Sequence, residues 1–181
     1  MRLREALGIA AMLAAFAAHA AVPRENVDVD AGKRALAARA LAFPVKGYEA
    51  MLRDNFDERR GKAPHEALDI MAPRGTPVVA VDDGTIAKLF TSKPGGLTIY
   101  QYDPGEKLAY YYAHLDRYAP GLKQGEKVKR GQVIGYVGST GNARADAPHL
   151  HFTVYALPPG KQWWRGVAIN AFEKLAAPVA P

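Results

Sequence analysis

The sequence predicts a mainly β fold, a compact antiparallel sheet or sandwich with a short N-terminal helical arm. From Pro64 onward, short apolar and β-branched runs alternate with Gly, Pro and Asp, which is typical of antiparallel strands joined by tight turns. Helical patterns are confined to about residues 30–41 and 170–175. Of the 181 residues, 49% are apolar, which indicates a folded domain with a real core.

The first twenty residues resemble an export signal. Arg2 and Arg4 form a positive start, residues 7–18 carry no charge, and Ala18-His19-Ala20 is a small-x-small cleavage site. The uncharged run is short for a membrane span, although an uncleaved N-terminal anchor is the alternative. We therefore expect a signal peptide at residues 1–20 and a protein of the periplasm or cell envelope.

The net charge and the residue content of the chain indicate which kinds of partner to expect. The net charge is +6, and it becomes +5 if Arg2, Arg4 and Glu5 leave with the signal segment. Such mild basicity suits solubility first and an anionic cell-wall polymer second. The chain has no long Lys/Arg run, so we expect no nucleic-acid partner. The chain has no cysteine, so we expect core packing and a bound metal to stabilise it without disulfides. We also expect a monomer.

Residues 21–45 form the predicted arm. Asp30 is a candidate N-cap for a helix to about Leu41, and Pro44 closes the segment. Because the apolar positions of this helix are mostly alanine, we expect the arm to dock loosely.

Residues 46–172 form the predicted domain, and residues 173–181 a C-terminal tail. A strand at 76–81 ends at the turn Asp82-Asp83-Gly84, and a second strand follows at 85–90. Strands at 97–102 and 108–115 flank a hairpin turn at 103–106. Segments 128–131 and 132–137 are expected to pair with each other, and 150–155 closes the sheet.

Four of the five histidines lie in three short clusters that could together hold one metal ion. In the first cluster, His65 and Asp69 are four residues apart and share a face of either a helix or a strand. Pro73 and Pro77 follow too soon for a long helix, so an extended backbone is favoured. That backbone turns Glu66 away from His65, and we do not assign Glu66 a catalytic role. Imidazole and carboxylate are common zinc ligands, and this set leaves room for water.

The other two clusters are in predicted strands. His149 and His151 are two apart, so both imidazoles point one way and Leu150 points into the core. His114 ends an alternating set with Tyr110 and Tyr112, and the pattern places all three on one strand face.

These clusters, read as HxxxD, AHL and HLHF, resemble peptidase family M23, the LytM or lysostaphin-type metallopeptidases. The resemblance covers roughly residues 43–169. The sequence between the clusters carries further motifs of the family: Gly75-Thr76-Pro77-Val78, Asp83-Gly84, Gly131-Gln132-x-Ile134-Gly135 and Gly138-Ser139-Thr140-Gly141-Asn142. Small departures are Ala67 for a frequent Gly, Ala147-Pro148 for Gly-Pro, and Asn170-Ala171 for Asn-Pro.

The resemblance implies a lysostaphin-like, duplicated-hybrid fold and a zinc endopeptidase that cuts the peptide crosslinks of peptidoglycan. It implies that His65, Asp69 and His151 bind Zn²⁺, and that His114 and His149 are the catalytic partners that handle the water and the oxyanion. By position and charge, Arg59 and Arg60 are candidates to meet a peptide carboxylate, and Asn142 and Arg144 are further candidates for substrate contact.

Three other functions remain open at this point. The same chemistry could serve a secreted protease acting on Gly-rich protein. The chain could instead be a metal-free, wall-binding activator of another hydrolase, although it keeps every residue of the ligand set. A sugar-phosphotransfer carrier with a phosphorylated histidine is a fourth possibility, but such carriers work in the cytoplasm, which the export signal disfavours.

Overall fold

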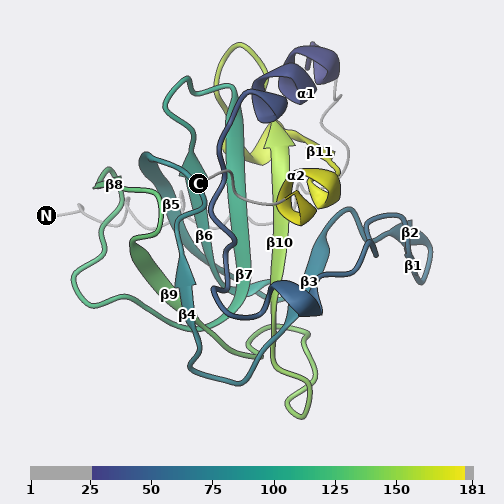
Figure 1. The fold of residues 1–181 in the computed structure, drawn as a ribbon, viewed down its shortest axis with the longest axis vertical. Helices are drawn as coiled ribbons and strands as arrows, with labels where there is room; N and C mark the ends of the chain where they lie inside the picture. The colour runs from purple at the N-terminus through teal and green to yellow at the C-terminus, as the bar shows by residue number, and fades with distance from the viewer. Residues whose placement is uncertain (1–25, 178–181) are drawn as a thin grey trace, which may run out of the picture.

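The computed structural model describes residues 26–177. The expected signal segment at residues 1–20 and the last residues of the expected tail, 178–181, lie outside this part. Most strands belong to one nine-stranded sheet (Figure 1). Its members are β3 (Leu68–Met71), β4 (Pro77–Val79), β5 (Gly84–Ser92), β6 (Gly96–Tyr102), β7 (Leu108–Tyr118), β8 (Lys127–Val128), β9 (Val133–Val137), β10 (His149–Ala156) and β11 (Val167–Ile169).

β7 is the centre of this sheet. It pairs with β6 on one side and β10 on the other, and its last residues also pair with β9. The first half of β10 pairs with β3, and its last residues pair with β11. Every strand pair is antiparallel, so the predicted mainly β, antiparallel fold is confirmed.

The pairing expected between 128–131 and 132–137 is wrong. β8 pairs with β5, whereas β9 pairs with β4 and β7. The turn between β8 and β9 therefore connects two different parts of the sheet instead of closing a hairpin. The hairpin of β6 and β7 around 103–106 is present as predicted.

The helices and short turns lie outside the large sheet. They are α1 (Val29–Ala37), η1 (Glu49–Met51), η2 (Trp163–Arg165) and α2 (Phe172–Ala176). Within residues 26–177, no helix combines the length and the apolar character needed to span a bilayer.

The helix of the arm begins two residues earlier than predicted, and the arm packs more tightly than expected. The Asp28 side chain, not that of Asp30, caps α1 by accepting from the backbone N–H of Ala31 at 2.8 Å, and the helix ends at Ala37. The expectation of loose docking is wrong, because Leu36 is buried, as are Leu41, Phe43 and Val45 in the segment that follows.

The arm packs at the end of the sheet away from the histidines. Gly32 of α1 lies so close to Ala156 that a Cβ built on Gly32 would come within 2.4 Å of the Ala156 Cβ. Ala156 is the last residue of the eight-residue strand β10, and His149 is the first. At about 3.3 Å per residue, these two positions are roughly 23 Å apart. Helix α1 therefore does not cover the histidine clusters.

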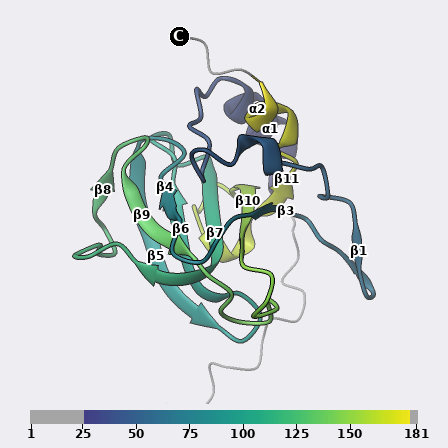
Figure 2. The ribbon, with the colours of Figure 1, turned by 60° about the horizontal axis from the view of Figure 1, so that its bottom comes forward.

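A two-stranded hairpin, β1 (Arg59–Arg60) and β2 (Ala63–Pro64), immediately precedes the first histidine cluster. It projects from the body of the molecule beside β3 (Figures 1 and 2). All four of its strand residues are exposed.

Candidate metal centre

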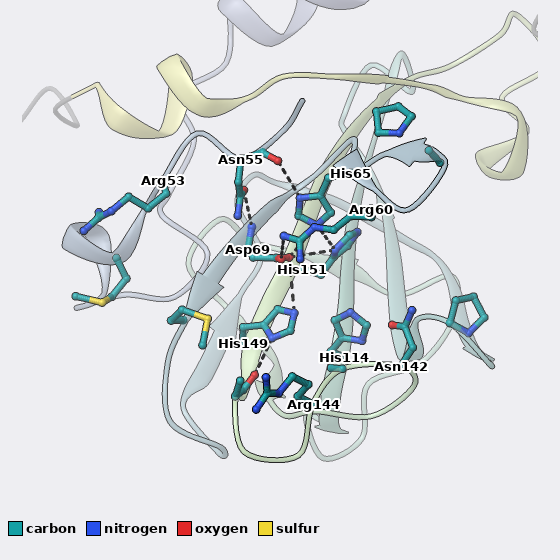
Figure 3. Close-up of a pocket in the computed structure, with 17 residues that line it drawn as sticks. Arg53, Asn55, Arg60, His65, Asp69, His114, Asn142, Arg144, His149 and His151 are labelled. Carbon is teal, nitrogen blue, oxygen red and sulfur yellow. Dashed lines mark hydrogen bonds and ion pairs between the residues drawn. The ribbon is translucent and has the colours of Figure 1, made fainter. Parts of the chain in front are cut away.

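A groove of about 790 Å³ opens where the start of β10 meets β3 and β7. Its walls come from η1 and the segment after it, the β1–β2 hairpin, and the loop at 142–147. The five residues singled out by the sequence all line this groove: His65, Asp69, His114, His149 and His151. Figure 3 shows their side chains gathered from segments far apart in the chain.

Three side chains bring ligand atoms to one point. Asp69 Oδ1 lies 3.1 Å from His65 Nε2 and 3.2 Å from His151 Nδ1, and the two nitrogens are 3.2 Å apart. Strand pairing causes this arrangement, because His151 of β10 lies directly opposite Asp69 of β3. These three side chains could hold a metal ion.

His65 reaches this point from irregular backbone. Its N–H donates to the carbonyl of Glu58 at 2.7 Å, and the next residue, Glu66, has φ of 55°. The left-handed residue breaks the extended run predicted for 65–69, and β3 begins only at Leu68. Glu66 is absent from the groove lining.

Asn55 supports two of the three candidate ligands. Its carbonyl lies 3.0 Å from His65 Nδ1, and its side-chain Oδ1 accepts from the backbone N–H of Asp69 at 3.2 Å. Because a carbonyl only accepts, His65 donates from Nδ1 to Asn55, and Nε2 is the ring nitrogen that faces Asp69. Such a partner fixes both the tautomer and the ring orientation of a ligand.

Arg60 supports the third candidate ligand. Its Nη2 donates to Asp69 Oδ2 at 3.0 Å and to Glu58 Oε2 at 3.1 Å. One oxygen of Asp69 thus faces the two imidazoles while the other faces a guanidinium. These intramolecular pairs engage Arg60 Nη2, and the contact of Arg60 with a peptide carboxylate stays a prediction.

His114 and His149 form a second layer beside the three candidate ligands. Their ring centroids are 4.9 Å apart, and His114 lies 5.5 Å from the His151 ring. His114 Nδ1 is 2.8 Å from the Thr140 carbonyl, and His149 Nδ1 is 2.9 Å from the Ala147 carbonyl. These carbonyl partners place a proton on Nδ1 of each ring and leave Nε2 facing the groove, and Nε2 of His149 lies 3.7 Å from Asp69 Oδ1.

His114 does not share a face with Tyr110 and Tyr112, as the alternating pattern predicted. Both tyrosines are fully buried in the core, whereas His114 lines the groove. The pairing of β7 with β6 shifts register near this position, and His114 has φ of 59°. This bulge turns the histidine out of the alternation. The prediction for β10 is confirmed, since Leu150 is buried while His149 and His151 line the groove.

Two glycines hold the loop that fixes His114. A Cβ on Gly96 would lie 2.1 Å from Thr140 Oγ1, and one on Gly141 would lie 2.3 Å from the Gly96 nitrogen. Both glycines also have positive φ, of 63° and 80°. Their contact keeps the Thr140 carbonyl against the His114 ring.

The ionisation of these groups follows from burial and from Asp69. Burial opposes the charge of Asp69, but hydrogen bonds from His151 and His65 outweigh it and hold the pKa of Asp69 below its usual range. Burial lowers the pKa of His114 to about 4 and also lowers that of His151. For His65, burial is outweighed by the bonds to Asp69 and Asn55, and its pKa is raised. His114 is accordingly neutral near pH 7.

Asn55 was not identified from the sequence. It acts through a backbone carbonyl and an amide ten residues before His65, and neither contact has a spacing pattern. Only its position shortly before the first histidine cluster could have indicated it.

The family model described as Peptidase family M23 matches residues 63–170. An L-Ala–D-Glu endopeptidase of Bacillus subtilis is 36% identical over 136 residues, which cover 71% of this chain and 41% of that protein. The peptidoglycan DD-endopeptidase ShyA of Vibrio cholerae is 34% identical over 130 residues, 67% of this chain and 27% of that protein. The chain thus spans less than half the length of these curated relatives.

Solved structures show the same fold. The catalytic domain of lysostaphin from Staphylococcus simulans superposes with a TM-score of 0.55 at 32% identity, covering 63% of this chain and 80% of that domain. A zinc-containing peptidase from Vibrio cholerae gives a TM-score of 0.58 at 28% identity, covering 79% of this chain and 41% of that one. The lysostaphin-like fold and the resemblance found in the sequence are confirmed, and the chain belongs to peptidase family M23.

Proposed function

We propose that this protein is a zinc-dependent endopeptidase that hydrolyses the peptide crosslinks of peptidoglycan. The observation that carries the proposal is the meeting of three candidate ligand atoms within 4.8 Å of one another, beside two further histidines in an open groove. Relatives named as peptidoglycan endopeptidases support the substrate class. The export signal expected at residues 1–20 supports a location in the periplasm or cell envelope.

The residues present fit zinc. His65, Asp69 and His151 supply two imidazoles and one carboxylate, a set that leaves a coordination position for water or substrate. With Zn²⁺ bound, two neutral imidazoles and one carboxylate would leave the metal and its three ligands with a net charge of about +1. Arg60 and Asn55 already orient the candidate ligands. Zinc held there would supply Lewis acidity, polarising the scissile carbonyl and making water a better nucleophile near neutral pH.

His114 and His149 carry the proton transfers in this proposal. Each ring donates from Nδ1 to a backbone carbonyl, so Nε2 is the nitrogen available at the groove for proton transfer. Either ring can accept the proton of the attacking water and later return it to the leaving amine. The other ring, when protonated, stabilises negative charge developing on the carbonyl oxygen.

Mass spectrometry of fragments released from purified sacculi tests this function. We expect wild-type protein to release cleaved crosslinks, the same protein with a zinc chelator to release none, and added Zn²⁺ to restore release. His151→Ala should bind no stoichiometric zinc and cleave at least a thousandfold more slowly, since it loses one of the three candidate ligands that would hold the zinc.

Two outcomes would contradict the proposal. Zinc-free native protein, or full activity in His151→Ala, would exclude the metal mechanism. Cleavage of casein or elastin with intact sacculi would instead identify a protease of Gly-rich protein.

A further inference from the structure

We propose that Arg53, Met51 and Met71 form a subsite of the groove that binds a peptide residue carrying an aliphatic portion and a free carboxylate. This inference rests on the proposed function and defines which crosslinks the groove selects. The occupant is a carboxylate-bearing residue of the stem peptide, next to the bond that is cut.

The apolar part of the subsite is an exposed pair of methionines. Within residues 26–177, Met51 and Met71 are among the few large apolar side chains that are exposed, each at 43%. Both line the groove. Met71 lies opposite His149 in the pairing of β3 with β10, so this surface adjoins the candidate catalytic residues. Flexible thioether chains exposed in a groove suit contact with an aliphatic ligand.

The charged part of the subsite is a guanidinium held in place by backbone. Arg53 Nη1 donates to the carbonyls of Ala50 at 2.8 Å and Leu52 at 2.7 Å. No carboxylate within the described residues pairs with Arg53, and its neighbour Asp54 instead accepts from the Asn170 side chain at 3.0 Å. The charge of Arg53 and its remaining N–H donors are therefore uncommitted.

The other two arginines of the groove differ from Arg53 in this respect. Arg144 forms two hydrogen bonds to Asp146, at 3.0 and 2.7 Å. Arg60 is shared between Glu58 and Asp69. Figure 3 shows Arg53 across the candidate metal centre from Asn142, so its charge lies at one side of the groove.

These properties select a particular ligand chemistry. A guanidinium that is already oriented binds a carboxylate through parallel N–H···O bonds and repels an ammonium group. The two exposed methionines of the same groove contribute contact area only to a ligand with methylene or methyl groups. A crosslink residue with both features fills the subsite, whereas a glycine bridge has no side chain to place there.

Two crosslinked peptide dimers test the subsite, identical except that the carboxylate beside the crosslink is free in one and a carboxamide in the other. We expect the zinc-loaded wild-type protein to cleave the acid form with a kcat/KM about tenfold higher, the value of one charge-assisted contact. Arg53→Gln should lose this preference, with a higher KM for the acid form and a smaller effect on the amide form. Arg53→Lys should keep part of the preference, and Arg34→Gln, the same charge change on α1, should keep all of it.

The remaining outcomes separate this proposal from the proposed function. Equal cleavage of both dimers by wild type, or an equal loss on both in Arg53→Gln, would overturn the subsite. Cleavage of neither dimer would count against the proposed function. In that case, fluorescence anisotropy of labelled dimers with wild-type protein still decides the subsite, since tighter binding of the acid form supports it and equal binding refutes it.

Discussion

His114 is the residue whose properties depend most on its surroundings. Its left-handed backbone places the ring in the groove, burial keeps the ring neutral, and the Thr140 carbonyl fixes the proton on Nδ1. A neutral imidazole with an unprotonated Nε2 is a proton acceptor at neutral pH. The fold therefore prepares His114 for its proposed role before any substrate binds.

The lowered pKa of His114 predicts a pH-dependent loss of stability. In the unfolded chain its pKa is 6.5, and in the folded protein burial lowers it to about 4. Between these values only the unfolded state takes up the proton, so this group lowers the free energy of unfolding as pH falls from about 6.5 toward 4 and has no effect above that range. We expect wild type to lose more melting temperature between pH 7 and pH 5 than His114→Gln.

Circular dichroism in the presence of a chelator measures this difference without a contribution from metal release. Equal losses in the two proteins would show that the His114 pKa is not lowered by folding.

At the residue scale, the sequence predicted contacts that follow from regular spacing. The interval of two between His149 and His151 implies a shared strand face, and the structure has it. The same spacing argument gave the wrong strand face for His114, because a bulge and a positive φ interrupt β7. The pairing of Asp69 with Arg60 could not be foreseen, since Arg60 reaches it from an exposed hairpin and no periodicity links the two.

At the scale of elements, the arm packs more tightly than its alanine-rich composition predicted. The alanine-rich helix has few large side chains, and much of the apolar contact comes from Leu41, Phe43 and Val45 beyond its end. Gly32 adds a close approach to β10 that a larger residue would prevent. Small residues allow close packing here, contrary to the prediction that an alanine-rich helix docks loosely.

Arg39 fastens this arm to the sheet. It pairs with Asp103, whose side chain is fully buried, and its Nε lies 3.6 Å from Asp82 Oδ2. Arg39→Ala should lower the free energy of unfolding by about 2 kcal/mol, because a buried carboxylate loses its partner charge. Three backbone N–H groups still donate to Asp103, which limits the loss.

Urea denaturation measures the effect, with the exposed Arg34→Ala on α1 as the matched control. Activity on sacculi should persist wherever the variant is folded, because α1 lies at the far end of β10 from His149. A stability equal to that of Arg34→Ala would show that the ion pair contributes nothing.

For the whole molecule, the candidate metal centre joins parts of the chain that are distant in sequence. Its residues come from the segment after the hairpin, from β3 and from β10, and β10 also pairs with β7 at the centre of the sheet. A metal bound there stabilises only the folded state. The proposed zinc is therefore expected to contribute to stability as well as to catalysis.

Chelation should lower the melting temperature of the wild-type protein by roughly 10 °C, as expected when free metal is about a thousandfold above its dissociation constant. Asp69→Asn, which keeps the shape but weakens the ligand, should respond much less to the chelator. Differential scanning calorimetry with and without added Zn²⁺ provides the measurement. A wild-type melting temperature that is insensitive to chelation would exclude a structural contribution.

The sequence predicted the antiparallel fold and the site at this scale, but not all of the connections. The segments now seen as β8 and β9 are adjacent in the chain and were expected to pair. Instead, Val128 lies opposite Gly84 of β5, and Gly135 lies opposite Val78 of β4. Local turn chemistry indicates where the chain reverses, whereas long-range packing decides which strand becomes the neighbour.

The glycine contact beside His114 also bears on how this groove could be redesigned. Gly96 and Gly141 touch with no room for a side chain, so loop exchange on that side would displace the Thr140 carbonyl. The β1–β2 hairpin also lines the groove, and both its strands and its tip at Gly61 and Lys62 are exposed. Substrate preference is therefore best changed by substitutions at the hairpin tip, while the loops that contain Gly96 and Gly141 are left unchanged.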